Sequence, residues 1–468
     1  MDFLTPTLDF ELKKPLYSQL YEYIRHEITQ GSIPPGERLP SKRKLSAHLN
    51  ISQNTVQAAY DQLLVEGYVG TQPKRGVYVN ELDNLINLEI DLEKPHTRPQ
   101  RQQPSRNFRY DFGPGSVDSC SFPVRTWKRL VCEVLGEGAA DLAANGYPQG
   151  DPALRSTISA YLHQSRGVVC DPGQIIVGSG IENLLQLLIQ LLGKNLVFAL
   201  ENPGYEKINL LFESNKKRFV PIDLDDEGVS ITALSQSEAD ILYVTPSHQF
   251  PTGLVMPIRR RLSLLKWAHA APERYIIEDD YDGEFKYRGK PIPAMQGLDG
   301  GQKTIYIGSF SNSLAPSLRI SYMVLPSHLL DRYLDRLSFY VCPVPAIEQQ
   351  CLRLFIGRGH FARHLNRMRT VYKRKRELLA GAIERTLKDV EILGENAGLH
   401  LMLRVKNGMR EDELVETAAR CGVRLVGASR YYLRYPANRP FPDILLSYGA
   451  LPEEDIANAI SSLGKAWS

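Results

Sequence analysis

Apolar residues recur at helical spacing at the start of the chain. Leu16, Leu20, Ile24 and Ile28 fall four residues apart, which predicts one buried helical face, and Gly31 is a natural stop for that helix. A proline-rich connection, "SIPPGERLP", follows. The chain therefore begins with a short amphipathic helix whose apolar side needs a partner.

Two further helices are predicted after this connection, and a serine precedes each of them. Ser41 can cap "KRKLSAHL", in which Leu45 and Leu49 face inward, and Ser52 can cap "QNTVQAAYDQLLVEG". The predicted buried face of the third helix consists of Val56, Ala59, Tyr60, Leu63 and Leu64. The segment "YVGTQPKRGVYVN" then predicts two short strands around a turn. Three helices followed by a hairpin are the layout of a winged helix-turn-helix.

The polar side of the third helix carries side chains of the kind that hydrogen-bond to base edges in the major groove. The predicted DNA contacts are Ser52, Gln53, Asn54, Thr55 and Gln57, with Lys42, Arg43, Lys44, Lys74 and Arg75 beside them on the phosphate backbone or in the minor groove. A charge run alone is usually a solvated face. Here the basic residues flank a predicted recognition helix, which favours a DNA-binding domain over residues 1–80.

The pattern changes after the hairpin. Residues 81–109 lose the apolar period and become rich in Pro, Gln and Arg, which predicts an exposed linker. Beyond it, apolar runs such as "QIIVGSG", "ADILYV" and "KTIYIGS" alternate with helical segments to about residue 325. This alternation predicts an α/β domain with a mostly parallel sheet within residues 110–468, and the helices and strands after residue 340 indicate a smaller α+β part at 340–468.

Composition limits the class of protein. A chain of 468 residues is long enough for several domains, and 43% hydrophobic with 23% charged residues is typical of a globular protein. No apolar run approaches the roughly 20 residues of a membrane span, and the N-terminus has no signal-peptide pattern, so we expect a cytoplasmic protein without a membrane partner. The net charge of +3 points to no particular partner, and the six cysteines show no metal-ligand spacing, so no metal site is expected.

Polar residues follow the predicted strands, at the edge where a parallel sheet collects its binding groups. They are Ser179, Tyr205, His248, Asp279, Tyr281 and Ser309. A carboxylate after a buried strand can pair with a ring nitrogen, and a glycine turn with serines and an arginine can hold a phosphate. A single Asp after a strand is more often a turn residue or a cap. Together, however, these groups suit pyridoxal phosphate.

The N-terminal pattern resembles the DNA-binding domain of GntR-type bacterial regulators. Their second helix follows a Leu-Pro-Ser-x-Arg-x-Leu-Ala turn, which stands here at residues 39–45 with Ser46 in place of the alanine. Their recognition helix opens with Ser-x-x-Thr-Val, which stands here at residues 52–56. Residues 110–468 resemble the fold-type I aminotransferases. The whole chain thus resembles the MocR-type, GabR-like branch of the GntR family.

This resemblance implies a role for each polar group. Asp279 would bind the pyridine nitrogen, and Tyr281 would bind the ring hydroxyl, with His248 nearby. Tyr205 would stack on the ring. The groups around the phosphate would be Ser179, Gly180, Ser309, Ser311 and Arg319. Arg430 is the candidate for the carboxylate of an amino acid effector, and the family implies a homodimer on promoter DNA.

One position departs from the family pattern. The family has Ser-Lys-x-Leu-Ala-Pro-x-Leu-Arg where residues 311–319 stand, and Asn312 replaces the lysine that would bond to the cofactor's aldehyde. An amide is no nucleophile and does not shuttle protons, so the cofactor would be held non-covalently or as an adduct with an amino acid. The asparagine is either natural or an introduced substitution that traps such an adduct.

These observations favour a transcriptional regulator that responds to an amino acid or an amine, and not an enzyme. One alternative is an aminotransferase with an accessory DNA-binding module, which Asn312 disfavours. The other is a scaffold whose pocket binds no cofactor.

Overall fold

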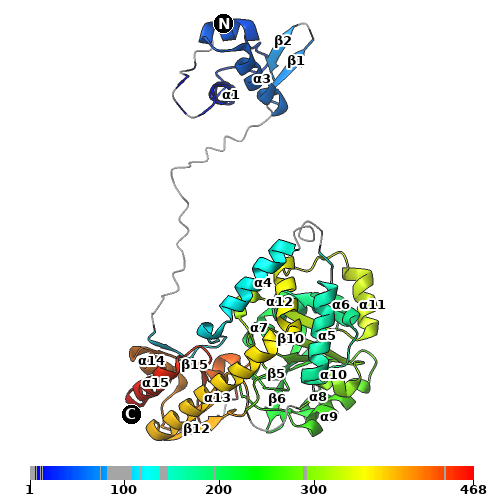
Figure 1. Ribbon diagram of the computed structural model, residues 1–468, viewed down its shortest axis with the longest axis vertical. Coiled ribbons are helices and arrows are strands. Elements are labelled where there is room, and N and C mark those ends of the chain that lie inside the picture. Colours follow the sequence, from blue (N-terminus) through cyan, green and yellow to red (C-terminus); the bar gives the residue numbers. More distant parts are fainter. Residues whose placement is uncertain are drawn as a thin grey trace. The chain divides into compact units, whose positions relative to one another are not determined.

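The computed structural model describes residues 6, 8–10, 12, 14–73, 75–81, 108–115, 117–137, 146–193, 195–287, 292–436 and 439–467. The chain divides into two compact units, Met1–Ser105 and Arg106–Ser468 (Figure 1). Most of the predicted linker, residues 81–109, lies outside the described residues, so the domain boundaries expected from the sequence stay predictions.

The first unit consists of three helices and a β-hairpin. Its elements are α1 (Leu16–Thr29), α2 (Lys42–Leu49), α3 (Gln53–Val65), β1 (Val69–Gln72) and β2 (Gly76–Val79). Serines cap two of the helices, as expected. The Ser41 hydroxyl accepts a hydrogen bond from the Lys44 amide at 3.3 Å. The Ser52 hydroxyl accepts one from the Thr55 amide at 3.0 Å. The apolar sides of the three helices share one core, which confirms the predicted winged helix-turn-helix.

An eight-stranded sheet lies at the centre of the second unit, in the order β4-β11-β10-β9-β8-β5-β6-β7. Its strands are β4 (Ile175–Gly178), β5 (Val197–Asn202), β6 (Arg218–Asp225), β7 (Gly228–Val229), β8 (Ile241–Val244), β9 (Tyr275–Asp280), β10 (Thr304–Ser309) and β11 (Ser321–Val324). Only β11 and β7 run antiparallel to their neighbours among these strands. The predicted mostly parallel sheet is therefore confirmed.

Successive residues of the buried strands pack into different cores on the two faces of this sheet. In β9, Ile276 belongs to one apolar cluster and Ile277 to another. The helices in the part of the chain that contains this sheet are α4 (Val124–Glu137), α5 (Pro152–Arg166), α6 (Ile181–Leu192), α7 (Glu206–Ser214), α8 (Ile231–Gln236), α9 (Ile258–His269), α10 (Met295–Asp299) and α11 (Ser327–Leu337). Because both faces are covered, the central strands are buried on both sides. β8 is apolar throughout, whereas β5 and β9 are apolar at their starts and polar at their carboxyl ends.

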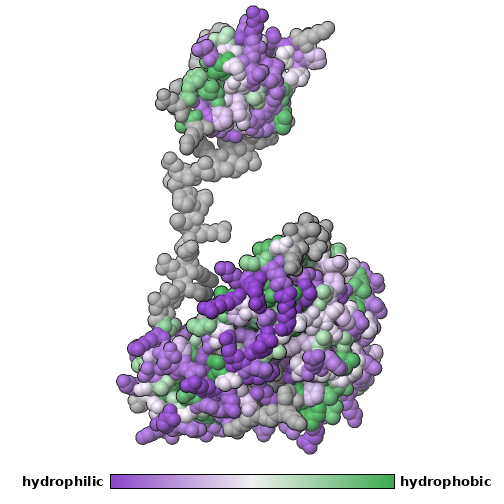
Figure 2. All heavy atoms as spheres, viewed as in Figure 1, coloured by the Kyte–Doolittle hydropathy of each residue, from purple (hydrophilic) through white to green (hydrophobic). Residues whose placement is uncertain are grey.

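The rest of the second unit is a smaller α+β part. It contains α12 (Ala346–Gly357), α13 (His360–Thr386), α14 (Glu411–Arg420), α15 (Glu453–Ala466) and a sheet of β12 (Val390–Leu393), β13 (His400–Val405), β16 (Asp443–Ser447) and β15 (Val426–Gly427). Hydrophilic residues gather over α4 and α13 on the face that Figure 2 shows. Arg363 and Arg367 are among the exposed residues of α13. Among the described residues, no helix combines the length and the hydrophobicity that a membrane crossing requires.

The first strand of the second unit, β3 (Tyr110–Asp111), pairs with a strand of this smaller part and not with the large sheet. The pairing is parallel, and the partner strand is β14 (Val423–Arg424). The Ser447 amide of β16 donates to the Phe112 carbonyl at 3.0 Å, and Asp111 forms an ion pair with Arg424 at 3.0 Å. The sequence did not predict this pairing.

Candidate functional site

Helix α3 presents its first turn on the surface of the first unit. Gln53 and Asn54 are exposed, whereas Thr55 is partly buried. Gln57 is engaged within the domain, because it accepts a hydrogen bond from Lys42 of α2 and donates one to Asp61. The residues expected to contact bases are thus brought onto one helix, and Gln53 and Asn54 are the most accessible of them.

The basic residues near α3 differ in what surrounds them. Arg43, Lys44 and Arg75 are exposed, and within the described part of the chain none of them forms an ion pair with a carboxylate. Lys74 lies outside the described residues. The positive charge beside α3 is therefore open to a partner in solution.

In the second unit, the predicted polar residues meet at one edge of the sheet. β4, β5, β8, β9 and β10 run in the same direction, so their carboxyl ends lie at the same side. The residues that follow or end these strands are Ser179, Tyr205, His248, Asp279, Tyr281 and Ser309. The strand order, which the sequence does not contain, brings them together.

Asp279 is a buried carboxyl at the end of β9. Its Oδ2 accepts a hydrogen bond from the Tyr243 hydroxyl of β8, and its buried Oδ1 has no partner among the described residues. Burial raises the pKa of Asp279 to about 7, against the opposing effect of the Tyr243 bond. A buried oxygen without a partner needs a donor. A protonated ring nitrogen is a donor of the right charge.

Tyr281 and Asn312 are neighbours at this edge. The Tyr281 hydroxyl donates to the carbonyl oxygen of His248 at 2.8 Å, and Asn312 Nδ2 donates to the Tyr281 carbonyl at 3.3 Å. Asn312 lies in the loop after β10, three residues beyond Ser309. The asparagine is therefore within the group of residues that the sequence predicts around the cofactor ring.

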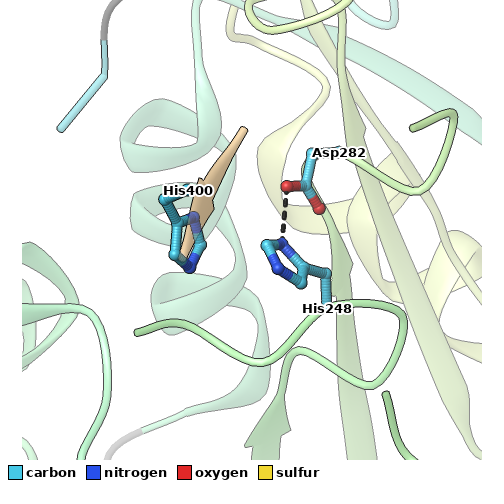
Figure 3. A group of neighbouring side chains, drawn as sticks. All are labelled: His248, Asp282 and His400. Atoms are coloured by element: carbon cyan, nitrogen blue, oxygen red, sulfur yellow. Dashed lines mark hydrogen bonds and ion pairs between the residues drawn. The ribbon is translucent and has the colours of Figure 1, made fainter. Parts of the chain in front are cut away.

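The side chain of His248 faces the smaller part of the second unit. Figure 3 shows it between Asp282 and His400 of β13. Its Nδ1 lies 2.8 Å from Asp282 Oδ2, and the rings of His248 and His400 are 4.4 Å apart. Burial lowers the pKa of His248 to about 3 and that of His400 well below its usual value, so both rings are neutral at pH 7.

These three residues could offer ligand atoms to a metal ion, since the atoms lie within 4.8 Å of one another. The two rings are tilted by 39° relative to each other. Gly398 packs directly against His248 and Asp282, so a β-carbon at residue 398 would lie 2.6 Å from Asp282 Oδ2. The cluster joins the large sheet to the smaller part, and His248 Nε2, His400 Nε2 and Asp282 Oδ1 are buried without a hydrogen-bond partner among the described residues. The predicted place of His248 beside a ring hydroxyl stays a prediction.

An aromatic wall borders the same edge. Tyr205 meets Phe250 edge to face at 5.4 Å, and Phe250 also contacts Tyr281 at 6.4 Å and Tyr431 at 5.0 Å. Phe250 is buried at the centre of this group. The wall provides the flat apolar surface against which a ring can stack.

Hydroxyl groups and one arginine gather beside the start of α6. The Ser309 hydroxyl donates to that of Ser311 at 3.0 Å and accepts from Ser321 at 3.0 Å. Gly180, with φ of +102°, precedes α6, and a β-carbon there would clash with the Arg319 guanidinium. The glycine therefore allows Arg319 to lie over the helix start, where anions bind well.

Both arginines that the sequence assigns to anion binding hold a glutamate. Arg319 Nη2 lies 2.7 Å from Glu182 Oε2, and Arg430 Nη2 lies 2.6 Å from Glu206 Oε2. Lys207 Nζ lies 3.9 Å from the other oxygen of Glu182. The positive charges of this site are therefore paired within the chain.

A second buried carboxyl lies in β5. Glu201 Oε2 accepts hydrogen bonds from the Thr245 hydroxyl at 2.6 Å and from Gln249 Nε2 at 3.2 Å, while Oε1 has no partner among the described residues. Burial raises the pKa of Glu201 to about 7, and the charge of Asp279 contributes. Two carboxyls at this edge therefore change charge near neutral pH.

Comparison with known proteins identifies the family. Residues 16–79 match the profile of the "Bacterial regulatory proteins, gntR family". The chain is 42% identical over 466 residues to YdeL of Bacillus subtilis (strain 168), an uncharacterized HTH-type transcriptional regulator, with 99% of each chain covered. It is 33% identical to the probable rhizopine catabolism regulatory protein MocR of Rhizobium meliloti, over 98% of this chain and 95% of that one. The chain belongs to the MocR-type regulators of the GntR family.

A structural comparison agrees with this assignment. The kynurenine aminotransferase of Pyrococcus horikoshii aligns with 77% of this MocR-type chain and 91% of its own, with a TM-score of 0.69 and 23% identity. This likeness confirms the aminotransferase-like fold of the second unit. The predicted class, a transcriptional regulator with an aminotransferase-like domain, is confirmed by the relatives.

Several residues of this MocR-type site were not singled out from the sequence, among them Glu182, Glu201, Glu206, Tyr243 and Phe250. Phe250 lies within the loop "PSHQFPTG" that follows β8. Tyr243 lies in an apolar strand, where an aromatic residue is usually core. Glu182 and Glu206 lie in the first turns of their helices, where acidic residues are common.

Proposed function

We propose that this MocR-type regulator senses an amino acid or a related amine through pyridoxal phosphate, which its aminotransferase-like domain binds without a covalent bond. The observation that carries the proposal is the meeting of Asp279, Tyr281 and Asn312 at one edge of the sheet. The unpartnered Oδ1 of Asp279 suits the ring nitrogen, and Asn312 offers no amine to the cofactor's aldehyde.

The other groups at this edge suit the remaining parts of the cofactor. Tyr205 and Phe250 would border the ring, while Ser309, Ser311 and Arg319 would bind the phosphate. The cofactor, when bound, supplies an aldehyde that combines reversibly with a primary amine. Support for this pocket also comes from the Pyrococcus aminotransferase of the same fold, whose structure is a complex with PMP.

Asn312 is the residue that would let the site bind a ligand without catalysing a reaction on it. An asparagine amide neither attacks the aldehyde nor accepts a proton from a bound amino acid, so the residues around it would bind the ligand without converting it. In the regulator, a bound ligand would favour one arrangement of the large sheet and the smaller part, which meet at His248 and His400.

The first unit would bind promoter DNA through α3. Gln53 and Asn54 would lie against base edges, and Arg43, Lys44 and Arg75 would contact phosphates. A homodimer, as the family implies, would place two copies of α3 on two half-sites.

An absorption titration tests the ligand part of the proposal. Pyridoxal phosphate is added to the full-length protein, followed by a panel of amino acids and amines, and each sample is then treated with borohydride and weighed by intact mass spectrometry. We expect a spectral change that depends on one amine and no gain in the mass of the chain. Asn312→Lys is the matched variant, in which pyridoxal phosphate alone should become attached to the chain.

Two results would contradict this part. The first is the absence of any spectral change in wild type with every amine. The second is a covalent mass gain in wild type, which would mean that another lysine reacts. For the DNA part, gel shifts compare the regulator's own promoter region with random DNA of equal length, and equal affinity for both would exclude sequence-specific regulation.

A further inference from the structure

Two ion pairs of similar geometry lie at the two arginines of the ligand site. The Arg319–Glu182 pair is 2.7 Å long with side chains 49% and 37% exposed, and the Arg430–Glu206 pair is 2.6 Å long with side chains 52% and 36% exposed. Both glutamates lie in the first turn of a helix, Glu182 in α6 and Glu206 in α7. A helix N-terminus favours a negative charge, so both carboxylates lie where an anion is stabilised.

Both carboxylates act electrostatically on residues of the site. The charge of Glu182 contributes to the raised pKa of Asp279, and the charge of Glu206 contributes to the raised pKa of Tyr431 in the aromatic wall. Glu182 Oε2 also lies 3.0 Å from the position that a β-carbon would take at Gly180. The two acids are therefore part of the site's charge balance and not distant surface groups.

We propose that Glu182 and Glu206 are specificity-determining residues, because each occupies an anion-binding arginine and must give way to one anionic group of the ligand. A phosphate would replace Glu182 at Arg319, and a carboxylate would replace Glu206 at Arg430. The inference rests on the proposed function and adds that the two glutamates compete with the phosphate and the carboxylate of the ligand. An adduct of pyridoxal phosphate with an amino acid carries both groups and would displace both glutamates.

Replacing a glutamate at either arginine by an anionic group of the ligand costs little free energy in this geometry. Ion pairs that are half exposed are weak, so a phosphate with a stronger charge competes well for the guanidinium. Lys207 Nζ, at 3.9 Å from Glu182 Oε1, is a second cation near the released carboxylate. A ligand with only one anionic group would displace only one glutamate, and the other arginine would keep its internal partner.

The first experiment uses inorganic phosphate as the probe. Thermal unfolding of wild type, Glu182→Gln and Glu206→Gln is followed while phosphate replaces chloride at constant ionic strength. Because Gln keeps a hydrogen-bonding oxygen but loses the charge, Glu182→Gln should bind phosphate roughly two- to fivefold more tightly, as the loss of a competing exposed ion pair predicts. Glu206→Gln is the matched control and should bind phosphate as wild type does.

The second experiment tests the carboxylate end with two stable adducts. N-(5'-phosphopyridoxyl)glycine and N-(5'-phosphopyridoxyl)methylamine differ only in the carboxylate, and calorimetry measures the affinity of each protein for both. Glu206→Gln should increase the preference for the glycine adduct, whereas Glu182→Gln should strengthen both adducts equally.

The outcomes separate this inference from the proposed function. If Glu182→Gln weakens phosphate binding or leaves it unchanged, Glu182 positions Arg319 or plays no part, and the inference is wrong. An unchanged preference between the two adducts in Glu206→Gln overturns the carboxylate half. If wild type binds neither pyridoxal phosphate nor the adducts while the effect of Glu182→Gln on phosphate is present, the cofactor assignment fails and the competition at Arg319 stands.

Discussion

The two units of this regulator hold their exposed positive charges in opposite ways. Near α3, Arg43, Lys44 and Arg75 face solvent without a carboxylate partner among the described residues. In the ligand site, Arg319 and Arg430 each hold a glutamate. A nucleic acid that binds the first set releases the counterions condensed on its phosphates, which makes the binding steeply dependent on salt. The second set is neutralised by the chain, so an anionic ligand would have to exchange with an internal anion.

The largest expected effect comes from a substitution that disrupts the first unit and leaves ligand binding by the second unit unchanged. Val56 is fully buried in the core of the first unit, so Val56→Asp places a charge among apolar side chains and should unfold that unit. We expect affinity for promoter DNA to fall by at least roughly a hundredfold, in line with the cost of a buried unpaired charge. Absorption titration with pyridoxal phosphate should be unchanged.

Val65→Asp is the matched control for this substitution. Val65 is the last residue of the same helix and is 88% exposed, so the same change of residue should leave DNA binding nearly intact. If Val56→Asp also abolishes the ligand titration, the two units do not fold independently and the comparison between them fails.

The next effect concerns the buried carboxyls, which the first unit lacks among its described residues. Burial raises the pKa of Glu201 to about 7 from an ordinary value of 4.5. Its neutral form therefore stabilises the fold below pH 4.5, and this stability is lost as the pH rises toward 7. Glu201→Gln stays neutral, so its advantage over wild type should grow from about 1 kcal/mol at pH 5 to about 3 kcal/mol at pH 8.

Gln is well suited to this position because Oε2 of Glu201 accepts all of its hydrogen bonds, while Oε1 has none among the described residues. Urea unfolding of the second unit at several pH values provides the measurement. Glu454→Gln, at an exposed position, should show no such dependence on pH. A constant difference between Glu201→Gln and wild type from pH 5 to 8 would show that Glu201 is already ionised.

A smaller effect tests the charge contrast directly. Arg43→Gln removes one cation beside α3, so the slope of log affinity against log salt should decrease by roughly 0.9 if Arg43 contacts one phosphate. Fluorescence anisotropy with labelled promoter DNA at several salt concentrations measures the slope. Arg420→Gln, which removes an exposed arginine of the second unit that pairs with Glu416, should leave the slope unchanged. A decrease in both variants would mean that the second unit also contacts DNA.

The smallest effect concerns a helix cap. Ser52 accepts the Thr55 amide at 3.0 Å, so Ser52→Ala should lower the unfolding free energy of the first unit by about 1 kcal/mol. Ser156 lies on the exposed side of α5 and donates to the Pro152 carbonyl, so Ser156→Ala should cost the second unit nothing. Thermal unfolding measures both. An equal loss in both variants would indicate that the hydroxyl and not the cap is responsible.

The two units also differ in how much of them could be predicted from the sequence. The first unit follows from local rules, since four-residue spacing and two capping serines determine its helices. The strands of the second unit and the polar residues at their ends were predicted in the same way. Asp279, expected after a buried strand, lies within β9 one residue before its end, and its role stays a prediction.

Pairings between distant segments could not be predicted in this way. Arg319 and Glu182 are 137 residues apart in sequence, and Arg430 and Glu206 are 224 residues apart. Periodicity describes which side of an element is buried, but it contains no information on which exposed side chains meet. For the same reason the sequence did not predict the contact of His248 with His400, a residue of the smaller part of the unit.

The pairing of β3 with β14 determines where the second unit receives the chain from the first. Tyr110 and Phe112 donate their amides to Gly422 and Arg424 at 3.1 Å, so the chain that arrives from the DNA-binding unit is fixed to the smaller part. The smaller part also carries Arg430 and His400. A rotation of the smaller part relative to the large sheet would therefore displace Tyr110, the point at which the chain enters the second unit.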